Sequence, residues 1–196
     1  LTTTWAKKYA DVPFAENFSY LNGNLELEEY KEGIYVGYRY FDSFGVKPLF
    51  PFGFGLSYTK FEVQLLSADE NADGITAVAT VKNIGARPGK EVVQLYCTAP
   101  QGLLGKPAKV RCAFAKTKTL APGESQTLML TAPWRNFASY DDSGATGHKS
   151  AFVLEAGDYI FSLGTDVRHA AENFTVTLPL MVVEQQESAA APAAAF

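Results

Sequence analysis

The sequence predicts a mainly β fold, an immunoglobulin-like β-sandwich of seven to eight strands that is preceded by an irregular segment. Apolar and polar residues alternate in short runs over roughly residues 58–180, and turn residues separate these runs. Aromatic residues make up 13% of the chain, with 14 Phe and 10 Tyr, which favours strands because flat side chains pack well on pleated surfaces. A barrel with the same number of strands remains an alternative, because periodicity alone does not distinguish the two architectures.

Eight segments carry the expected strand pattern. In the second of them, Ile75, Ala77, Ala79 and Val81 share one face. Pairs such as Asp73-Gly74, Pro122-Gly123 and Ala156-Gly157, together with single prolines, mark the turns. The strands are expected at 61–65, 75–81, 90–97, 109–120 (one strand or a pair), 128–131, 151–155, 158–164 and 174–178.

Tyr159 follows the turn at Gly157-Asp158, which resembles a tyrosine corner, a structural motif in which the Tyr hydroxyl ties its strand to the preceding loop. A tyrosine that simply packs within a strand is the alternative. Trp134 follows Pro133, and we expect it to pack at the edge of the sandwich, with stacking on a sugar ring as the alternative.

Residues 1–57, here called the N-terminal segment, are rich in aromatics but show a period of neither 2 nor 3.6 residues. Glycine and proline divide the segment into short turns and extended pieces. Without a repeating pattern it cannot build a core of its own, so its rings should be buried against another body. The aromatic residues concerned are Phe14, Phe18, Tyr35, Tyr38, Tyr40, Phe41, Phe50, Phe52 and Phe54.

Charged residues and glycines among these aromatics suggest structural roles. Glu32, Arg39 and Asp42 are expected to form an ion-pair network, because a buried Arg needs carboxylate or carbonyl partners. Backbone close approach or positive φ is the expected reason for glycine in this segment. The glycines in question are Gly33, Gly37, Gly53 and Gly55.

Three rings of the N-terminal segment could instead serve a ligand. Tyr38, Tyr40 and Phe44 are the candidate substrate-binding residues, as stacking platforms in a sugar cleft, although a purely structural role is the preferred interpretation.

Composition and short motifs give no sign of other chemistry. A net charge of -4 without a basic stripe argues against nucleic acid, and no apolar run is long enough for a membrane span. Cys97 and Cys112 are expected to be buried thiols rather than a disulfide, and no metal-ligand spacing or cofactor motif is present. The compartment stays open, with cytoplasmic, periplasmic and secreted locations all compatible.

Adjacent acids and the two histidines are expected to lie at the surface. The pairs Glu28-Glu29 and Asp141-Asp142 should not converge, because neighbouring side chains in an extended chain point to opposite faces. His148 and His169 lie in polar surroundings without a nucleophile pattern. Residues 181–196, here called the tail, are expected to be flexible, because the stretch from about Glu184 onward is polar and then alanine-rich.

The stretch YKEGIYVGYRYFDSFGVKPLFPFGFGLSYT (residues 30–59) resembles the run that ends the α/β sandwich domain of family 3 glycoside hydrolases and leads into their fibronectin-III-like domain. VKNIGARPGKEVVQLYCTAP (81–100), LAPGESQTLMLTA (120–132) and LEAGDYIFSLGTD (154–166) resemble later strands of that domain, in the family's order. The resemblance covers nearly everything from Leu1 to Pro179. It divides the chain into the end of an α/β domain with a linker (1–57), a fibronectin-III-like domain (58–180) and the tail.

This resemblance implies a parent β-glucosidase-like enzyme that removes terminal β-linked sugars with retention of configuration, using two carboxylates on catalytic domains upstream of these residues. Neither carboxylate motif is present, so the chain is expected to be a non-catalytic accessory part, with no catalytic residue of its own. Its expected partners are those upstream domains, and it would meet a glycoside substrate only through the parent enzyme. An independent carbohydrate-binding or adhesion module is the alternative.

Overall fold

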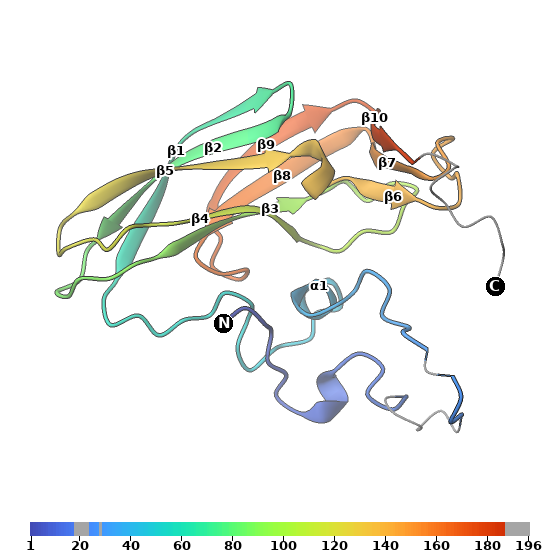
Figure 1. Cartoon of the computed structure of the whole chain (residues 1–196), viewed down its shortest axis with the longest axis horizontal. Helices are drawn as coiled ribbons and strands as arrows, with labels where there is room; N and C mark the ends of the chain where they lie inside the picture. Colours follow the sequence, from blue (N-terminus) through green and yellow to red (C-terminus); the bar gives the residue numbers. More distant parts are fainter. Residues whose placement is uncertain (18–23, 28, 187–196) are drawn as a thin grey trace.

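A computed structural model describes residues 1–17, 24–27 and 29–186 of the chain. Its main body is a β-sandwich with a smaller third sheet at one end, and the N-terminal segment lies along one side (Figure 1). The sheets are separate and open, so the barrel alternative is wrong. The elements are η1 (Tyr9–Asp11), α1 (Tyr38–Ser43), β1 (Phe61–Asn71), β2 (Gly74–Asn83), β3 (Val92–Thr98), β4 (Val110–Lys116), β5 (Ser125–Pro133), η2 (Trp134–Asn136), β6 (Ser139–Asp141), β7 (Ala151–Leu154), β8 (Gly157–Gly164), β9 (Glu172–Leu178) and β10 (Met181–Gln185).

Two antiparallel sheets enclose the core. One has the strand order β1-β2-β5 and the other β4-β3-β8-β9. Ile75, Ala77, Ala79 and Val81 of β2 have no exposed surface, which confirms that they share the inner face. They pack in one cluster with residues of the opposite sheet such as Phe161. The mainly β prediction is therefore confirmed, and the alternating pattern decides which side chains fill the space between the sheets.

The third sheet has the order β10-β7-β6 and extends one end of the sandwich. Two of its strands, β6 and β10, were not predicted, which raises the strand number among the described residues to ten. β10 also corrects the expectation for the start of the tail, because Met181–Gln185 pair with β7 instead of fraying. The remainder of the predicted flexible tail, residues 187–196, lies outside the described residues.

The N-terminal segment contains a short helix that the sequence pattern did not predict. α1 has six residues and begins after Gly37, whose φ of 57° reverses the chain. A helix this short is marginal in isolation, because few backbone hydrogen bonds offset its nucleation cost. Phe41, which is 4% exposed, provides the packing that holds it.

The predicted burial of the segment's aromatic rings is only partly realised. Tyr35, Tyr38, Tyr40, Phe50, Phe52 and Phe54 are half-buried, and Phe14 is exposed. Phe18 lies outside the described residues.

Candidate functional site: the joint between the N-terminal segment and the sandwich

The N-terminal segment is fastened to the sandwich by a set of side-chain contacts that we call the joint. The hydroxyl of Tyr38 accepts a hydrogen bond from the amide of Arg111 at 2.8 Å, and the hydroxyl of Ser43 accepts one from the amide of Ala108 at 2.8 Å. Both acceptors belong to α1, and both donors lie where the chain enters β4. α1 therefore satisfies backbone groups of the sandwich that would otherwise lack a partner.

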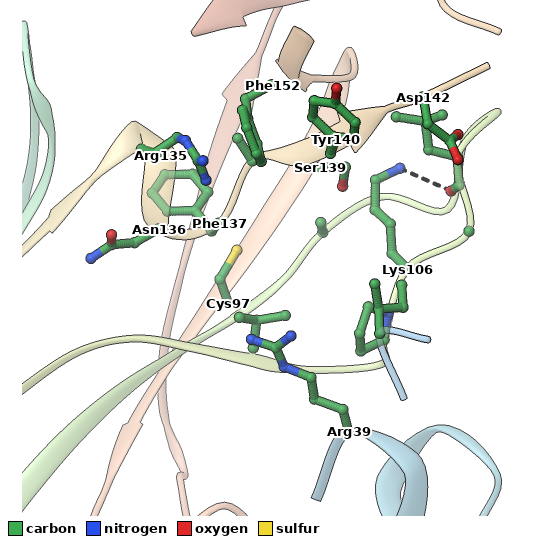
Figure 2. A pocket seen from close by; sticks show the side chains of 17 residues that line it. Arg39, Cys97, Lys106, Arg135, Asn136, Phe137, Ser139, Tyr140, Asp142 and Phe152 are labelled. Carbon is green, nitrogen blue, oxygen red and sulfur yellow. Dashed lines mark hydrogen bonds between the residues drawn. The ribbon is translucent and has the colours of Figure 1, made fainter. Parts of the chain in front are cut away.

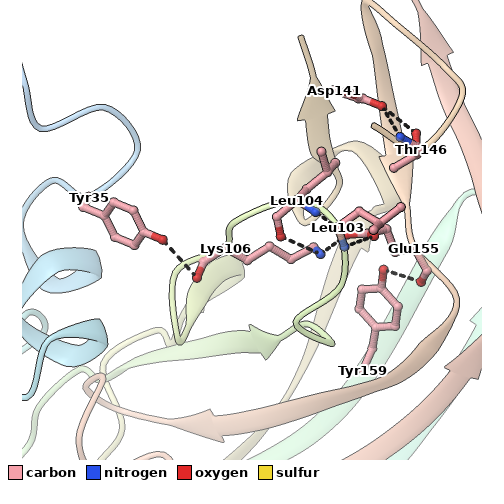
Figure 3. Close-up of polar contacts among 8 residues, drawn as sticks. All are labelled: Tyr35, Leu103, Leu104, Lys106, Asp141, Thr146, Glu155 and Tyr159. Atoms are coloured by element: carbon pink, nitrogen blue, oxygen red, sulfur yellow. Dashed lines mark hydrogen bonds and ion pairs between the residues drawn. The ribbon is translucent and has the colours of Figure 1, made fainter. Parts of the chain in front are cut away.

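A third contact of this kind involves Tyr35, which precedes α1. Its hydroxyl donates to the carbonyl of Lys106 over a long 3.5 Å (Figure 3). At that length the hydrogen bond is weak, so it orients the Tyr35 side chain but contributes little free energy.

Aromatic packing continues the joint beneath α1. The Tyr38 ring lies 5.0 Å from Phe52 and 6.1 Å from Tyr96 of β3, measured between ring centroids. The guanidinium of Arg111 lies 5.2 Å from the Phe52 ring and 4.8 Å from the Phe114 ring. This sandwiching of a cation between two aromatic faces stabilises the position of Phe52 against the sheet.

The loop after β8 forms the other side of the joint. Arg168 contacts a carboxylate oxygen of Asp42 at 2.7 Å and donates to the carbonyl of Val46 at 3.2 Å. The amide of Val167 donates to the carbonyl of Phe52 at 3.1 Å. Burial raises the pKa of Asp42, and the nearby Arg168 only partly offsets this effect.

The expected network of Glu32, Arg39 and Asp42 does not form among the described residues. Asp42 pairs with Arg168 of the sandwich instead, 126 positions along the chain, and Glu32 and Arg39 form no ion pair within the described part. The local sequence pattern could not show that the partner of Asp42 comes from a distant loop.

The glycines of the N-terminal segment differ in their roles. Gly53 has a φ of 90°, and a Cβ atom there would lie 2.6 Å from the Gln94 amide nitrogen and 2.7 Å from the Cα of Asp166, so only glycine fits. Gly33 and Gly37 have a φ of 57° with open space around them. Gly55 has neither a positive φ nor a close neighbour, which corrects the expectation for this residue.

The three candidate stacking rings are not equivalent. Tyr38 points into the joint through its bond to Arg111, so its hydroxyl serves the fold. Tyr40 is half-buried between Phe41 and Phe44, and Phe44 is 58% exposed. Contact with a substrate stays a prediction for all three rings.

The outer side of the N-terminal segment is apolar and open. Among the described residues, more than half of the exposed large hydrophobic side chains belong to this segment. Trp5 is 53% exposed, Tyr30 88%, Val36 60% and Leu56 86%. Large exposed apolar side chains gathered in one segment are a feature of protein interfaces.

Below the joint, a buried ion pair fixes the loop between β3 and β4, and sequence reasoning did not find it. The ammonium of Lys106 contacts the carboxylate of Glu155, and both side chains are less than 10% exposed (Figure 3). The carboxylate also accepts the amides of Leu103 at 2.6 Å and Leu104 at 3.2 Å. Burial disfavours the charged form, but these bonds outweigh it and lower the pKa of Glu155.

Tyr159 makes the contact expected of a tyrosine corner. Its hydroxyl donates to the carbonyl of Glu155 at 2.9 Å, four residues upstream, and Tyr159 has no exposed surface (Figure 3).

Trp134 packs at the edge of the sandwich, as expected. Its indole nitrogen donates to the Ala72 carbonyl at 2.9 Å, and its ring lies 5.8 Å from that of Phe137.

The prediction that Asp141 and Asp142 both lie at the surface is wrong for Asp141. It has no exposed surface, and its carboxylate accepts bonds from Gly144 at 2.6 Å and from both the amide and the hydroxyl of Thr146 at 2.8 and 2.7 Å. Burial opposes the charge, but these bonds hold the pKa of Asp141 well below its ordinary value. Asp142 is exposed. Asp141 thus closes the loop between β6 and β7.

The remaining predicted residues lie as follows. Cys97 and Cys112 are free, buried thiols, as preferred, and burial raises the pKa of both, that of Cys112 to about 12. His169 is exposed and lies 2.7 Å from Asp166, and His148 is half-buried. Glu29 pairs with Lys31 at 2.9 Å, and Glu28 lies outside the described residues.

The described part of the chain contains no group of three or more His, Cys, Asp or Glu side chains that could hold a metal ion. It also contains no helix of the length and apolarity that a membrane crossing requires. The described part of the N-terminal segment thus combines side-chain contacts to the sandwich with several exposed large apolar residues.

Comparison with known proteins finds similar sequences and structures within larger enzymes. Residues 91–167 match the fibronectin type III-like domain family. The chain is 50% identical to a β-glucosidase of Ruminococcus albus over 198 aligned residues, which cover all of the chain and 20% of that enzyme.

Solved structures agree. A β-glucosidase of Paenibacillus barengoltzii superimposes with a TM-score of 0.88 and 49% identity, over 99% of this chain and 22% of that one. A GH3 β-glucosidase of Bifidobacterium adolescentis does so with a TM-score of 0.78 and 30% identity, over 91% of this chain and 25% of that one. The chain thus spans about a fifth to a quarter of these relatives. It belongs with the β-glucosidases of glycoside hydrolase family 3, as the part that carries the fibronectin type III-like domain.

Proposed function

We propose that the chain is a non-catalytic accessory part of a family 3 exo-acting glycosidase, in which the sandwich supports the catalytic domains through the N-terminal segment. The exposed apolar side of that segment carries this proposal. Its inner side is bonded to the sandwich through Tyr38, Ser43 and Asp42, so its outer side is presented in a fixed position. A fixed apolar face is suited to hold a second body with little loss of conformational entropy.

The reaction proposed for the parent is hydrolysis of terminal β-D-glycosides with retention. Such chemistry needs a nucleophilic carboxylate and an acid/base carboxyl about 5 to 5.5 Å apart. The conspicuous buried acids of this chain are already engaged: Glu155 bonds Lys106, and Asp141 bonds the loop at Gly144 and Thr146. We therefore assign both reacting acids to the parts of the parent that lie outside residues 1–196.

Activity measurements test the non-catalytic assignment. The purified 196-residue chain should not hydrolyse an aryl β-glucoside, and the parent protein should. Turnover by the chain itself, at a rate above that of a heat-denatured control, would contradict the proposal.

The supporting role is tested by matched substitutions in the parent protein. Leu56→Asp places a charge on the apolar face of the N-terminal segment, and Met129→Asp places the same charge on an outward position of β5 that is 67% exposed. We expect Leu56→Asp to lower the melting temperature and the activity of the parent, because it would bury an unpaired charge at the contact. Met129→Asp should change neither. Equal effects of the two substitutions would refute a docking role for the segment.

A further inference from the structure

A hollow of about 520 Å³ lies between the N-terminal segment and the third sheet. Arg39 borders it on one side, and the stretch from Arg135 to Tyr140, together with Asp142, borders it on the other (Figure 2). This volume is typical of small-molecule sites, which combine apolar walls with a few polar groups. The apolar walls come from residues such as Leu104, Pro107 and Phe137.

One wall of the hollow is a stack of flat groups. The ring of Tyr140 lies 4.8 Å from that of Phe152, and the guanidinium of Arg135 lies 3.0 Å from the centre of the Phe152 ring. Tyr140 remains 39% exposed. A second hollow, of about 430 Å³, shares these three residues and continues to Glu184 and Gln186. The two hollows therefore lie against the same three side chains.

Polar groups without partners face the first hollow. The side chains of Arg39, Ser139 and Asp142 line it, and none of them forms a hydrogen bond or ion pair with another residue in the described ranges. A guanidinium offers several N–H donors in one plane, a carboxylate offers acceptors, and a hydroxyl offers both. Together they can bond a ligand that carries donors and acceptors at many positions.

The charges around the site balance. Arg135 pairs with Glu184 at 3.0 Å, and Lys106 pairs with the buried Glu155. The remaining Arg39 and Asp142 have opposite signs. A site without net charge gives no electrostatic advantage to an anion or a cation, so it favours a neutral ligand.

We propose that this site binds a neutral oligosaccharide. Sugar rings present apolar C–H faces that can pack on Tyr140, and hydroxyls that can bond Arg39, Ser139 and Asp142. This inference goes beyond the accessory role and does not depend on it, because the site is formed by residues of this chain alone.

Binding of cellotetraose to the 196-residue chain, measured by isothermal titration calorimetry, tests the proposal. We expect saturable binding that becomes about tenfold weaker in Tyr140→Ala, since loss of a stacking ring removes roughly 1.4 kcal/mol. Tyr58→Ala, which removes an equally large ring that is 93% exposed at another position, should bind as the unchanged chain does. Circular dichroism melting confirms that both variants are folded.

Two further arms make the outcome decisive. Arg39→Gln should weaken cellotetraose binding several-fold without loss of fold, because the residue has no partner in the described structure to lose. Tetragalacturonate, an anionic oligosaccharide, should bind more weakly than cellotetraose. The proposal is overturned if cellotetraose does not bind, if Tyr140→Ala binds it unchanged, or if the anionic sugar binds better. None of these results would bear on the accessory role, which is tested on the parent protein.

Discussion

The sandwich and the N-terminal segment handle their apolar residues in opposite ways. In the sandwich, Phe161, Leu95 and Tyr159 have no exposed surface, and their neighbours lie on strands of the same domain. In the N-terminal segment, Phe41 is the one large apolar side chain of the described residues that is buried, while Tyr30, Leu56 and others are open. The sandwich thus buries a core of its own, whereas the described part of the segment leaves many of its large apolar side chains exposed.

The residues of the two regions should therefore contribute to different properties of the protein. Substitutions in the sandwich should act on the stability of this chain. Substitutions on the outer side of the segment should act on whatever covers it. Matched substitutions in the two regions should therefore differ in their effects.

Removing a large aromatic ring should distinguish the two regions most clearly. Phe161→Ala should lower the free energy of unfolding by about 4 kcal/mol, because it leaves a cavity between Phe137 and Phe174. Phe44→Ala, at a position 58% exposed, should change it by less than about 0.5 kcal/mol. Urea unfolding followed by circular dichroism measures both. Similar losses for the two variants would remove the distinction.

The second-largest difference in stability should come from removing the carboxylates of Glu155 and Asp42, which both pair with cations. Glu155→Ala should cost about 3 kcal/mol, because Lys106 would keep a buried charge without a partner. Asp42→Ala should cost about 0.5 kcal/mol or less, because Arg168 is 35% exposed and water can replace the carboxylate. Chemical denaturation at neutral pH gives both values.

The pH dependence of stability provides a control for the Glu155 assignment. The pKa of Glu155 is lowered from its ordinary 4.5 in the folded chain, so its contribution is present above that value and is lost as the pH falls through the folded pKa. The unchanged chain should therefore lose more stability below about pH 4.5 than Glu155→Ala does. An equal acid loss in both proteins would show that Glu155 is not the group responsible.

Removing a tyrosine hydroxyl should lower stability by less than the substitutions above. In the N-terminal segment its effect should stay local. Tyr159→Phe leaves the buried carbonyl of Glu155 without its donor and should cost about 1.5 kcal/mol. Tyr38→Phe removes the acceptor for the Arg111 amide, and hydrogen exchange should quicken at that amide while the amides of β2 and β8 keep their rates. Faster exchange throughout the sandwich in Tyr38→Phe would contradict a local role.

The strands were predictable because their signal is local. The alternation in β2 and β9 needs only neighbouring residues, and turn residues mark the ends of these strands. β6 has three residues, too few to show a period, and β10 has only five, MVVEQ, which do not alternate between apolar and polar. Both are held by pairing with β7, which is a tertiary contact.

The contacts of the joint were not predictable for the same reason. Arg168 and Asp42 are far apart in sequence, as are Lys106 and Glu155, and no local pattern joins such pairs. Asp141 did carry a usable signal, because Ser143, Gly144 and Thr146 follow it with the composition of a tight turn that an Asp side chain closes. The adjacent Asp142 drew attention to an acid pair instead.

The central claim is that the outer side of the N-terminal segment is an apolar docking face, and a dye that fluoresces on exposed apolar surface tests it directly. Replacing Tyr30, Val36 and Leu56 together by Ser should remove most of the dye signal of the 196-residue chain, because these side chains are 60 to 88% exposed. Replacing Leu66, Phe114 and Met129 of the sandwich by Ser should leave most of the dye signal, although these side chains are 54 to 67% exposed. If the sandwich variant loses the signal and the segment variant keeps it, the docking face lies elsewhere and the account is wrong.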